Sequence, residues 1–368
     1  MTRPTDHSRT VRIADRPDDY RRLGIDPVEI RPFEDGQRIE PAPGAYEWWY
    51  FDAHLDGGAK LVVVFYTKPL MAPGVVLAPM ITINLDLPDG RSIVKTLHVP
   101  PNAFSASRDG CDVRIGDNRF TGDLHRYRIT ASIEEVSVDI EMVGEIQPWR
   151  PKSGHIYFGA EREEHLFAWL PSVPQGHVTA TYRVGAQEQR TTGIGYHDHN
   201  WGDVQMPQLM HNWYWGRAKV GPYTVIASHI TATEDYGFKP LTIFLLAKDG
   251  RIVVDDAAKV SFSTDDVGTD AVTGKPVADI TRYEYRDGEE RIVVTFRREK
   301  TVLQRRFTDL APWWKRLAAT LAGINPAYLR FTGLVTLQRF DGAEAVETIE
   351  QEALWELMYF GRPRPPAA

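Results

Sequence analysis

Short runs of β-favouring residues, separated by turn residues, constrain most strongly how this chain can fold. Runs 47–55 and 60–67 are rich in aromatic and β-branched residues, and Asp56-Gly57-Gly58 between them predicts a hairpin turn. Further strands are predicted at 80–86, 92–98, 111–115, 126–132, 135–142, 166–170 and 177–184. Strands that recur about every 8–12 residues are typical of an antiparallel sandwich or barrel.

A second series of strands follows the first. It is predicted at 212–219, 223–230, 241–247, 251–254, 280–285, 291–298, 301–307, 333–340 and 346–358. Each series opens with a Trp-rich strand, and a chain of 368 residues has room for two domains of roughly 150 residues each. The sequence therefore predicts an all-β chain with an irregular polar lead-in at 1–40 and domains at 41–205 and 206–368.

One amphipathic helix is predicted at 312–322 in the second domain. Trp313, Leu317 and Leu321 recur at four-residue spacing, and Pro312 suits the first helical turn. Packing on a sheet or at a barrel end is the favoured role. A contact with a bilayer surface is the alternative, because Trp313-Trp314 is followed by Lys315-Arg316.

Charge and cysteine content exclude several functional classes. The chain has 43 basic and 50 acidic residues and a net charge of -7, so no nucleic-acid partner is expected. Its single cysteine, Cys111, excludes an internal disulfide and a Cys-rich metal site, and favours a buried, inert thiol. We see neither a signal peptide nor an apolar run long enough to span a membrane, which predicts a cytoplasmic location.

The segment 193–202 contains several ionisable and aromatic side chains between glycines. In an extended conformation, alternate side chains point to opposite faces. Tyr196, Asp198 and Asn200 would then share one face. The other face would carry His197, His199 and Trp201.

Three interpretations of this motif remain open from spacing alone. In the first, Asp198 faces the barrel interior as a general acid beside Tyr196, kept protonated by aromatic walls. In the second, His197 and His199 bind a metal, with the distant His211 or His229 as third ligand. In the third, the motif is a structural corner in which Asp198 caps backbone amides.

Several other side chains are candidates to line a ligand cavity. Glu47 shares a face with aromatic residues, and we expect it either to contact substrate or to pair with an Arg or His. His211, Trp213 and Trp215 would lie on one face of a later strand as an aromatic wall, or as a satisfied core. Trp169 and Tyr66 are candidates of the same kind.

Two motifs together resemble the carotenoid 1,2-hydratase (hydroxyneurosporene synthase) family and its lipocalin-like relatives. They are Glu47-Trp48-Trp49-Tyr50-Phe51-Asp52 and Gly195-Tyr196-His197-Asp198-His199-Asn200-Trp201-Gly202. The resemblance covers residues from about 41 to 360 and implies two consecutive lipocalin-like antiparallel β-barrels, with an apolar site near the domain junction.

The resemblance also implies an activity. Members of the family hydrate an isolated double bond of a polyene without a cofactor, and relatives catalyse cyclisations and pericyclic steps. It assigns proton donation to Asp198, assisted by Tyr196. Alternation places His197, His199 and Trp201 on the other face, where we expect them to support this pair. One departure concerns an upstream His-x-Trp element: Trp169 is kept, but Phe167 stands at the His position and His165 lies two residues earlier.

The resulting expectation is a hydratase or cyclase that acts on a hydrophobic terpenoid or polyene substrate. No metal and no cofactor are expected, and the sequence does not define the oligomeric state. Two alternatives remain. One is a lipocalin-like carrier of a hydrophobic metabolite, and the other is a pericyclic cyclase that works by shape, as a Diels-Alderase does.

Overall fold

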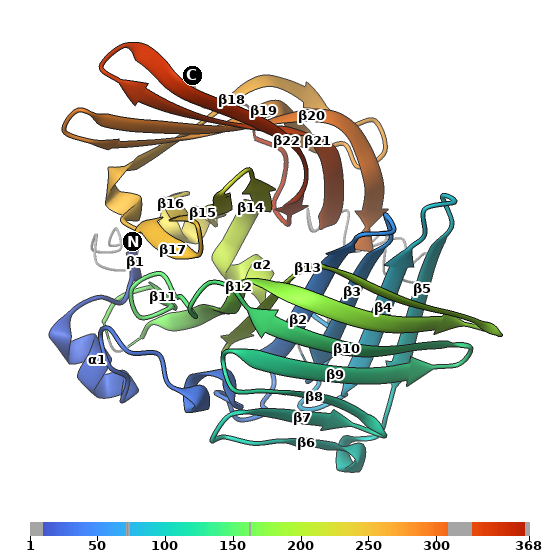
Figure 1. Ribbon diagram of the computed structural model, residues 1–368. Coiled ribbons are helices and arrows are strands. Elements are labelled where there is room, and N and C mark those ends of the chain that lie inside the picture. The colour runs from blue at the N-terminus through green and yellow to red at the C-terminus, as the bar shows by residue number, and fades with distance from the viewer. Residues whose placement is uncertain (1–9, 71, 73, 162, 308–325, 365–368) are drawn as a thin grey trace. The chain divides into compact units, whose positions relative to one another are not determined.

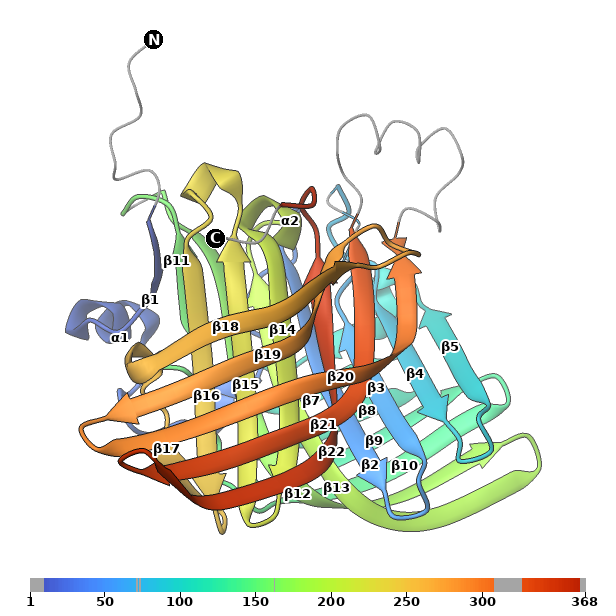
Figure 2. The same ribbon diagram turned by 90° about the horizontal axis from the view of Figure 1, so that it is seen from above.

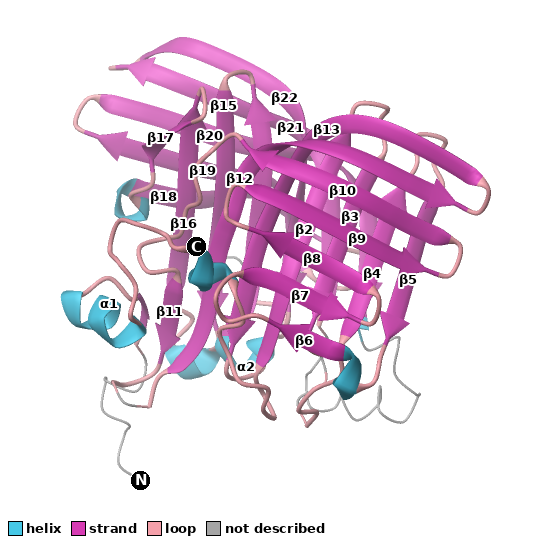
Figure 3. Cartoon of the chain, turned by 60° about the horizontal axis from the view of Figure 1, so that its bottom comes forward, coloured by secondary structure: helices cyan, strands magenta, loops and turns pink. Residues whose placement is uncertain are grey.

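The computed structural model describes residues 10–70, 72, 74–161, 163–307 and 326–364. These residues are mostly strand (Figure 3), which confirms the all-β prediction. The chain divides into two compact units, one formed by residues 12–206 and the other by 207–368 together with 1–11. The helix predicted at 312–322 lies outside the described residues.

The first unit is built on one antiparallel sheet that curls strongly (Figure 1). Its order is β5-β4-β3-β2-β13-β12-β10-β9-β8-β7-β6, and β11 pairs with β1 and β12. The strands are β1 (Val11–Ile13), β2 (Tyr46–Leu55), β3 (Lys60–Tyr66), β4 (Met80–Asp86), β5 (Ser92–His98), β6 (Phe104–Ala106), β7 (Cys111–Ile115), β8 (Asn118–Gly122), β9 (Arg126–Ile133), β10 (Val136–Gly144), β11 (His155–Phe158), β12 (His165–Val184) and β13 (Gln187–Gly202).

The hairpin β2–β3 forms as predicted, with Gly58 in the left-handed region at φ 85°. The predicted strands 166–170 and 177–184 are instead parts of one long strand, β12. Its pairing with β13 shifts register between Leu170 and Val173 and again between Val173 and Gly176. These irregularities bend β12 without ending it.

The lead-in is more ordered than its composition suggested. It contains α1 (Pro17–Leu23) and the 3-10 helix η2 (Pro32–Asp35). Pro17 opens α1, Asp19 closes a capping box at its start, and Gly24 ends it at φ 68°. Arg12 Nη1 donates to Asp19 Oδ2 at 2.6 Å, which ties α1 to β1.

The second unit is a nine-stranded antiparallel sheet that also curls, in the order β17-β16-β15-β14-β22-β21-β20-β19-β18 (Figure 2). Its strands are β14 (Met210–Val220), β15 (Tyr223–Ala232), β16 (Pro240–Lys248), β17 (Arg251–Val254), β18 (Val260–Thr269), β19 (Pro276–Asp287), β20 (Glu290–Arg306), β21 (Ala327–Asp341) and β22 (Glu344–Tyr359). The other short helices among the described residues are η3 (Pro101–Ala103), α2 (Met206–Leu209), η4 (Glu234–Tyr236) and η5 (Ala257–Lys259).

Each unit has a hydrophobic core of its own. The first core includes Trp49, Phe51 and Phe65, and the second includes Phe296 and Trp355. None of the helices in the described part of the chain has the length and apolar character needed to cross a bilayer.

Candidate active site

The two faces of strand β13 carry different ionisable side chains. Its neighbour β2 runs antiparallel, with His197 opposite Phe51 and Asp198 opposite Tyr50. The Phe51 face belongs to the hydrophobic core, so His197 points toward the core and Asp198 points away from it. The predicted separation of Asp198 from the two histidines is confirmed.

The expectation that Asp198 faces the barrel interior is wrong. Side chains of β2 that fill the core, Trp49 and Phe51, lie opposite His199 and His197. Because alternation is strict along paired strands, Asp198 must lie on the opposite face of the sheet. The acid therefore lies outside the core of the first unit.

Three donors converge on the Asp198 carboxyl group. Its Oδ2 accepts hydrogen bonds from Tyr196 Oη at 2.7 Å and Trp169 Nε1 at 2.8 Å. Its Oδ1 accepts a bond from Asn200 Nδ2 at 2.7 Å. The carboxyl group is buried at 6% exposure, so water competes little for these bonds.

Burial raises the pKa of Asp198 to about 7, because a carboxylate loses its hydration there. The hydrogen bonds from Tyr196 and Trp169 favour the charged form and hold the pKa below the value that burial alone would give. Asp52, which lies opposite Tyr196 on β2, raises the pKa of Asp198 further. The group is balanced between its two protonation states near neutral pH.

The opposite face of β13 carries a buried ionic network. His197 Nε2 lies 3.1 Å from Asp35 Oδ2, and His197 Nδ1 lies 2.8 Å from the Tyr50 carbonyl oxygen. His199 Nε2 lies 2.8 Å from Glu47 Oε1. Because Glu47 points to this face and pairs with His199, the structure does not bring it to Asp198 as a substrate contact.

Sequence reasoning missed Asp35, and it placed Asn200 on the face of Asp198 without giving it a role. Asp35 ends η2 in the lead-in, which we expected to be irregular, and it is 1% exposed. It accepts a hydrogen bond from Tyr127 Oη at 2.5 Å. No local signal marked Asp35, whereas the alternation that singled out Asp198 also placed Asn200 beside it.

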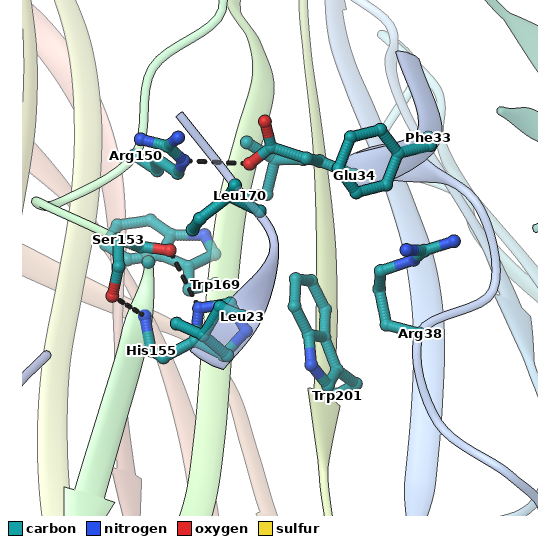
Figure 4. Close-up of a pocket in the computed structure, with 12 residues that line it drawn as sticks. Leu23, Phe33, Glu34, Arg38, Arg150, Ser153, His155, Trp169, Leu170 and Trp201 are labelled. Carbon is teal, nitrogen blue, oxygen red and sulfur yellow. Dashed lines mark hydrogen bonds and ion pairs between the residues drawn. The ribbon is translucent and has the colours of Figure 1, made fainter. Parts of the chain in front are cut away.

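A small cavity of about 40 Å³ lies on the lead-in side of β12 (Figure 4). That volume is enough to hold water, since one water molecule needs about 10–15 Å³ of such space. Among the predicted residues, Trp169 and Trp201 line it. The other lining residues are Leu23, Ile25, Phe33, Glu34, Arg38, Arg150, Ser153, Gly154, His155 and Leu170.

The remaining aromatic candidates lie on other strands. Tyr66 of β3 is opposite Trp48, which in turn is opposite Asn200, so Tyr66 shares the sheet face of Asp198. Trp213 and Trp215 are half-buried on β14 in the second unit. The Trp213 ring meets Phe360 edge-on at 5.4 Å.

The two histidines considered as a third metal ligand belong to the second unit and have other contacts there. His211 Nε2 meets the Arg362 carbonyl oxygen at 2.8 Å, and its ring packs edge-on against Tyr359. His211 therefore holds the C-terminal segment. His229 stacks on Phe262 at 3.9 Å, and burial lowers its pKa to about 4.

Two curated proteins are similar in sequence to a large part of this chain. The chain is 27% identical over 261 residues to hydroxyneurosporene dehydrogenase of Chlorobaculum tepidum, covering 60% of this chain and 66% of that protein. It is 24% identical over 255 residues to the quinolone epoxide rearrangement protein PenF of Penicillium thymicola, covering 64% and 69%. These matches leave about a third of each relative unmatched.

Solved structures share the fold. The crystal structure of CghA with Sch210972 superposes with a TM-score of 0.62 at 16% identity, over 89% of this chain and 95% of that one. Kievitone hydratase of Nectria haematococca gives a TM-score of 0.52 at 11% identity, over 87% and 91%. A family described as Diels-Alderase-like matches residues 39–311. The resemblance to the carotenoid 1,2-hydratase (hydroxyneurosporene synthase) family and its lipocalin-like relatives, drawn from the two motifs, is confirmed. The chain belongs to the Diels-Alderase-like family.

Proposed function

We propose that this protein is an acid catalyst that hydrates or cyclises a hydrophobic terpenoid or polyene-type substrate, with Asp198 as the proton donor. The observation that carries the proposal is the buried Asp198 carboxyl group held by Trp169, Tyr196 and Asn200. Three fixed donors around one carboxyl group orient it and stabilise the anion that remains after proton transfer.

The residues around Asp198 can form hydrogen bonds with its protonated form and with its ionised form. The oxygen and nitrogen of the Asn200 side-chain amide can exchange places by rotation, so Asn200 can donate to the carboxylate or accept from the protonated acid. The Tyr196 hydroxyl can likewise donate or accept. Proton transfer then requires only rotations of groups already in contact.

The proposed reaction begins when the Asp198 O–H bond breaks and its proton forms a C–H bond with the alkene π electrons. A carbocation and an Asp198 carboxylate result. Water then bonds to the cation through oxygen, and the proton it releases restores Asp198, so the net change is addition of one water. The electron-rich faces of Tyr50 and Tyr196, which meet edge-on at 6.2 Å, would stabilise a nearby cation.

Reactions other than hydration can also begin with protonation by Asp198. With an epoxide, the proton bonds to the ring oxygen and a C–O bond breaks, which leaves a cation that can rearrange. The name of the relative PenF describes rearrangement of an epoxide, and this supports epoxides as a second substrate class. If a carbon–carbon double bond within the substrate captures the cation, a ring with a new cation forms. This cation loses a proton to the Asp198 carboxylate, which restores the acid and gives a product with the same mass as the substrate.

The test is turnover by Asp198→Asn, which keeps the shape but cannot donate a carboxylic proton. Purified protein is incubated with a panel of terpenoid olefins and epoxides, and products are identified by mass spectrometry as water adducts or as isomers. We expect Asp198→Asn to lose about 10²–10⁴-fold in rate, the usual contribution of a general acid. The matched control is Asp139→Asn, at an exposed position of β10.

The Diels-Alderase-like family assignment favours a pericyclic cyclase as the second candidate. Such an enzyme accelerates reaction by holding the substrate in a reactive shape, without proton transfer. Full activity of Asp198→Asn, together with loss of activity in Trp169→Ala, would support this candidate and exclude acid catalysis.

A further inference from the structure

The core side of β13 holds a cluster of metal-type ligands that the proposed reaction does not use. Asp35 of η2, Cys111 of β7 and His197 of β13 each place one donor atom so that the three lie within 4.8 Å of one another. The three residues are buried, with exposures of 1%, 4% and 0%. They come from segments far apart in sequence, and only the fold brings them together.

The contacts around this cluster direct His197 and Asp35 toward each other, whereas Cys111 Sγ lies 3.8 Å from the Phe120 carbonyl oxygen. His197 Nδ1 faces the Tyr50 carbonyl, which can only accept, so Nδ1 carries the proton. In a neutral ring, Nε2 then offers its lone pair on the side of Asp35. Tyr127 donates to Asp35 Oδ2, which leaves Asp35 Oδ1 for another partner. Metal-binding histidines and carboxylates are typically oriented by such secondary hydrogen bonds.

Unsatisfied polar atoms mark the same place. Within the described part of the chain, Asp35 Oδ1 and His199 Nδ1 have no hydrogen-bond partner, although both are buried. They lie 3.6 Å apart. The other ring nitrogen of His199 faces Glu47 at 2.8 Å, the carboxylate–histidine arrangement that often supports a metal ligand. A buried polar atom without a partner is costly, and an ion bound at Asp35 would satisfy its Oδ1.

We propose that Asp35, Cys111 and His197 form a zinc site on the core side of the first unit, beside the ring of His199. Mixed nitrogen, oxygen and sulfur donors suit zinc, which binds them at about 2.0–2.3 Å in a tetrahedron. The site lies on the face of β13 opposite Asp198, so the zinc would stabilise the fold and take no part in the proposed reaction.

Cobalt substitution tests the proposal on the whole chain. The protein is refolded with zinc or with cobalt(II) and desalted, its zinc is measured by mass spectrometry, and its cobalt absorption is recorded. Because Cys111 is the only cysteine, a thiolate-to-cobalt charge-transfer band can arise in this chain from that residue alone. We expect stoichiometric zinc and this band in the cobalt form.

Variants separate this site from adventitious binding. Cys111→Ser and His197→Gln should each lower the zinc content by about tenfold or more, whereas the exposed His177→Gln should retain it. If the two site variants fail to fold, the wild-type cobalt band decides alone. Substoichiometric zinc with no charge-transfer band in the wild-type protein would overturn the proposal and leave Asp35 and His197 as an ion pair sharing a proton.

Discussion

At the scale of single residues, His155 shows how burial sets a protonation state. Its Nδ1 donates to the Ser153 carbonyl oxygen at 2.7 Å, and its ring meets Trp201 edge-on at 5.4 Å. Burial lowers the pKa of His155 from its ordinary value of 6.5 to about 4. The folded protein therefore holds this imidazole neutral at pH values where the unfolded chain would protonate it.

The consequence is a pH-dependent stability with a definite sign. Between pH 6.5 and 4 the unfolded chain binds a proton at His155 that the folded chain does not, so stability falls as pH is lowered. The full loss is about 3 kcal/mol. Urea denaturation at a series of pH values should show this slope reduced in His155→Phe, which retains an aromatic ring against Trp201.

The control for that experiment is His98→Gln on β5, whose side chain is exposed to solvent. It should keep the wild-type slope. An unchanged slope in His155→Phe would show that His155 titrates equally in both states, contrary to its burial.

At the scale of elements, β13 depends on glycines for its close approach to β2. A Cβ atom at Gly193 would collide with the His54 carbonyl oxygen and lie 2.8 Å from Leu55 Cα. Both obstacles are backbone, which cannot rotate away. Small residues at such positions let two strands keep the register that places Asp198 opposite Tyr50.

Gly193→Ala should therefore destabilise the first unit. We expect a loss of about 1–3 kcal/mol in the free energy of unfolding, the range for overpacked sites, measured by urea denaturation. Gly57→Ala is the matched control, because a Cβ there meets nothing within 4 Å. A smaller loss in Gly193→Ala than in Gly57→Ala would contradict the close packing of β13 on β2.

The same strands show what the sequence could and could not predict. Alternation along 195–201 correctly separated Asp198 from His197, because the side-chain period of a strand is fixed by its backbone. Alternation alone could not say which face would meet the core. That depended on β2, where Trp49 and Phe51 fill the interior. The contact of Asp35 with His197 could not be predicted either. The two residues are 162 positions apart in sequence, and Asp35 belongs to no periodic pattern.

At the scale of the whole molecule, the chain contains two separate hydrophobic cores. Leu61 lies fully buried in the first, and Leu329 lies fully buried in the second. A unit with its own core can unfold cooperatively by itself, because few of its stabilising contacts depend on the other core. The structure thus supports a proposal that the two units are distinct domains.

Matched substitutions in the two cores test this division. Leu61→Ala and Leu329→Ala each leave a cavity that should cost about 2–5 kcal/mol, and the cost should be confined to one unit. Hydrogen exchange followed by mass spectrometry would measure it. Leu61→Ala should accelerate exchange in peptides from 12–206 by about tenfold or more and leave those from 207–364 unchanged, and Leu329→Ala should do the reverse. Equal acceleration across both units in either variant would mean that the chain unfolds as a single cooperative domain.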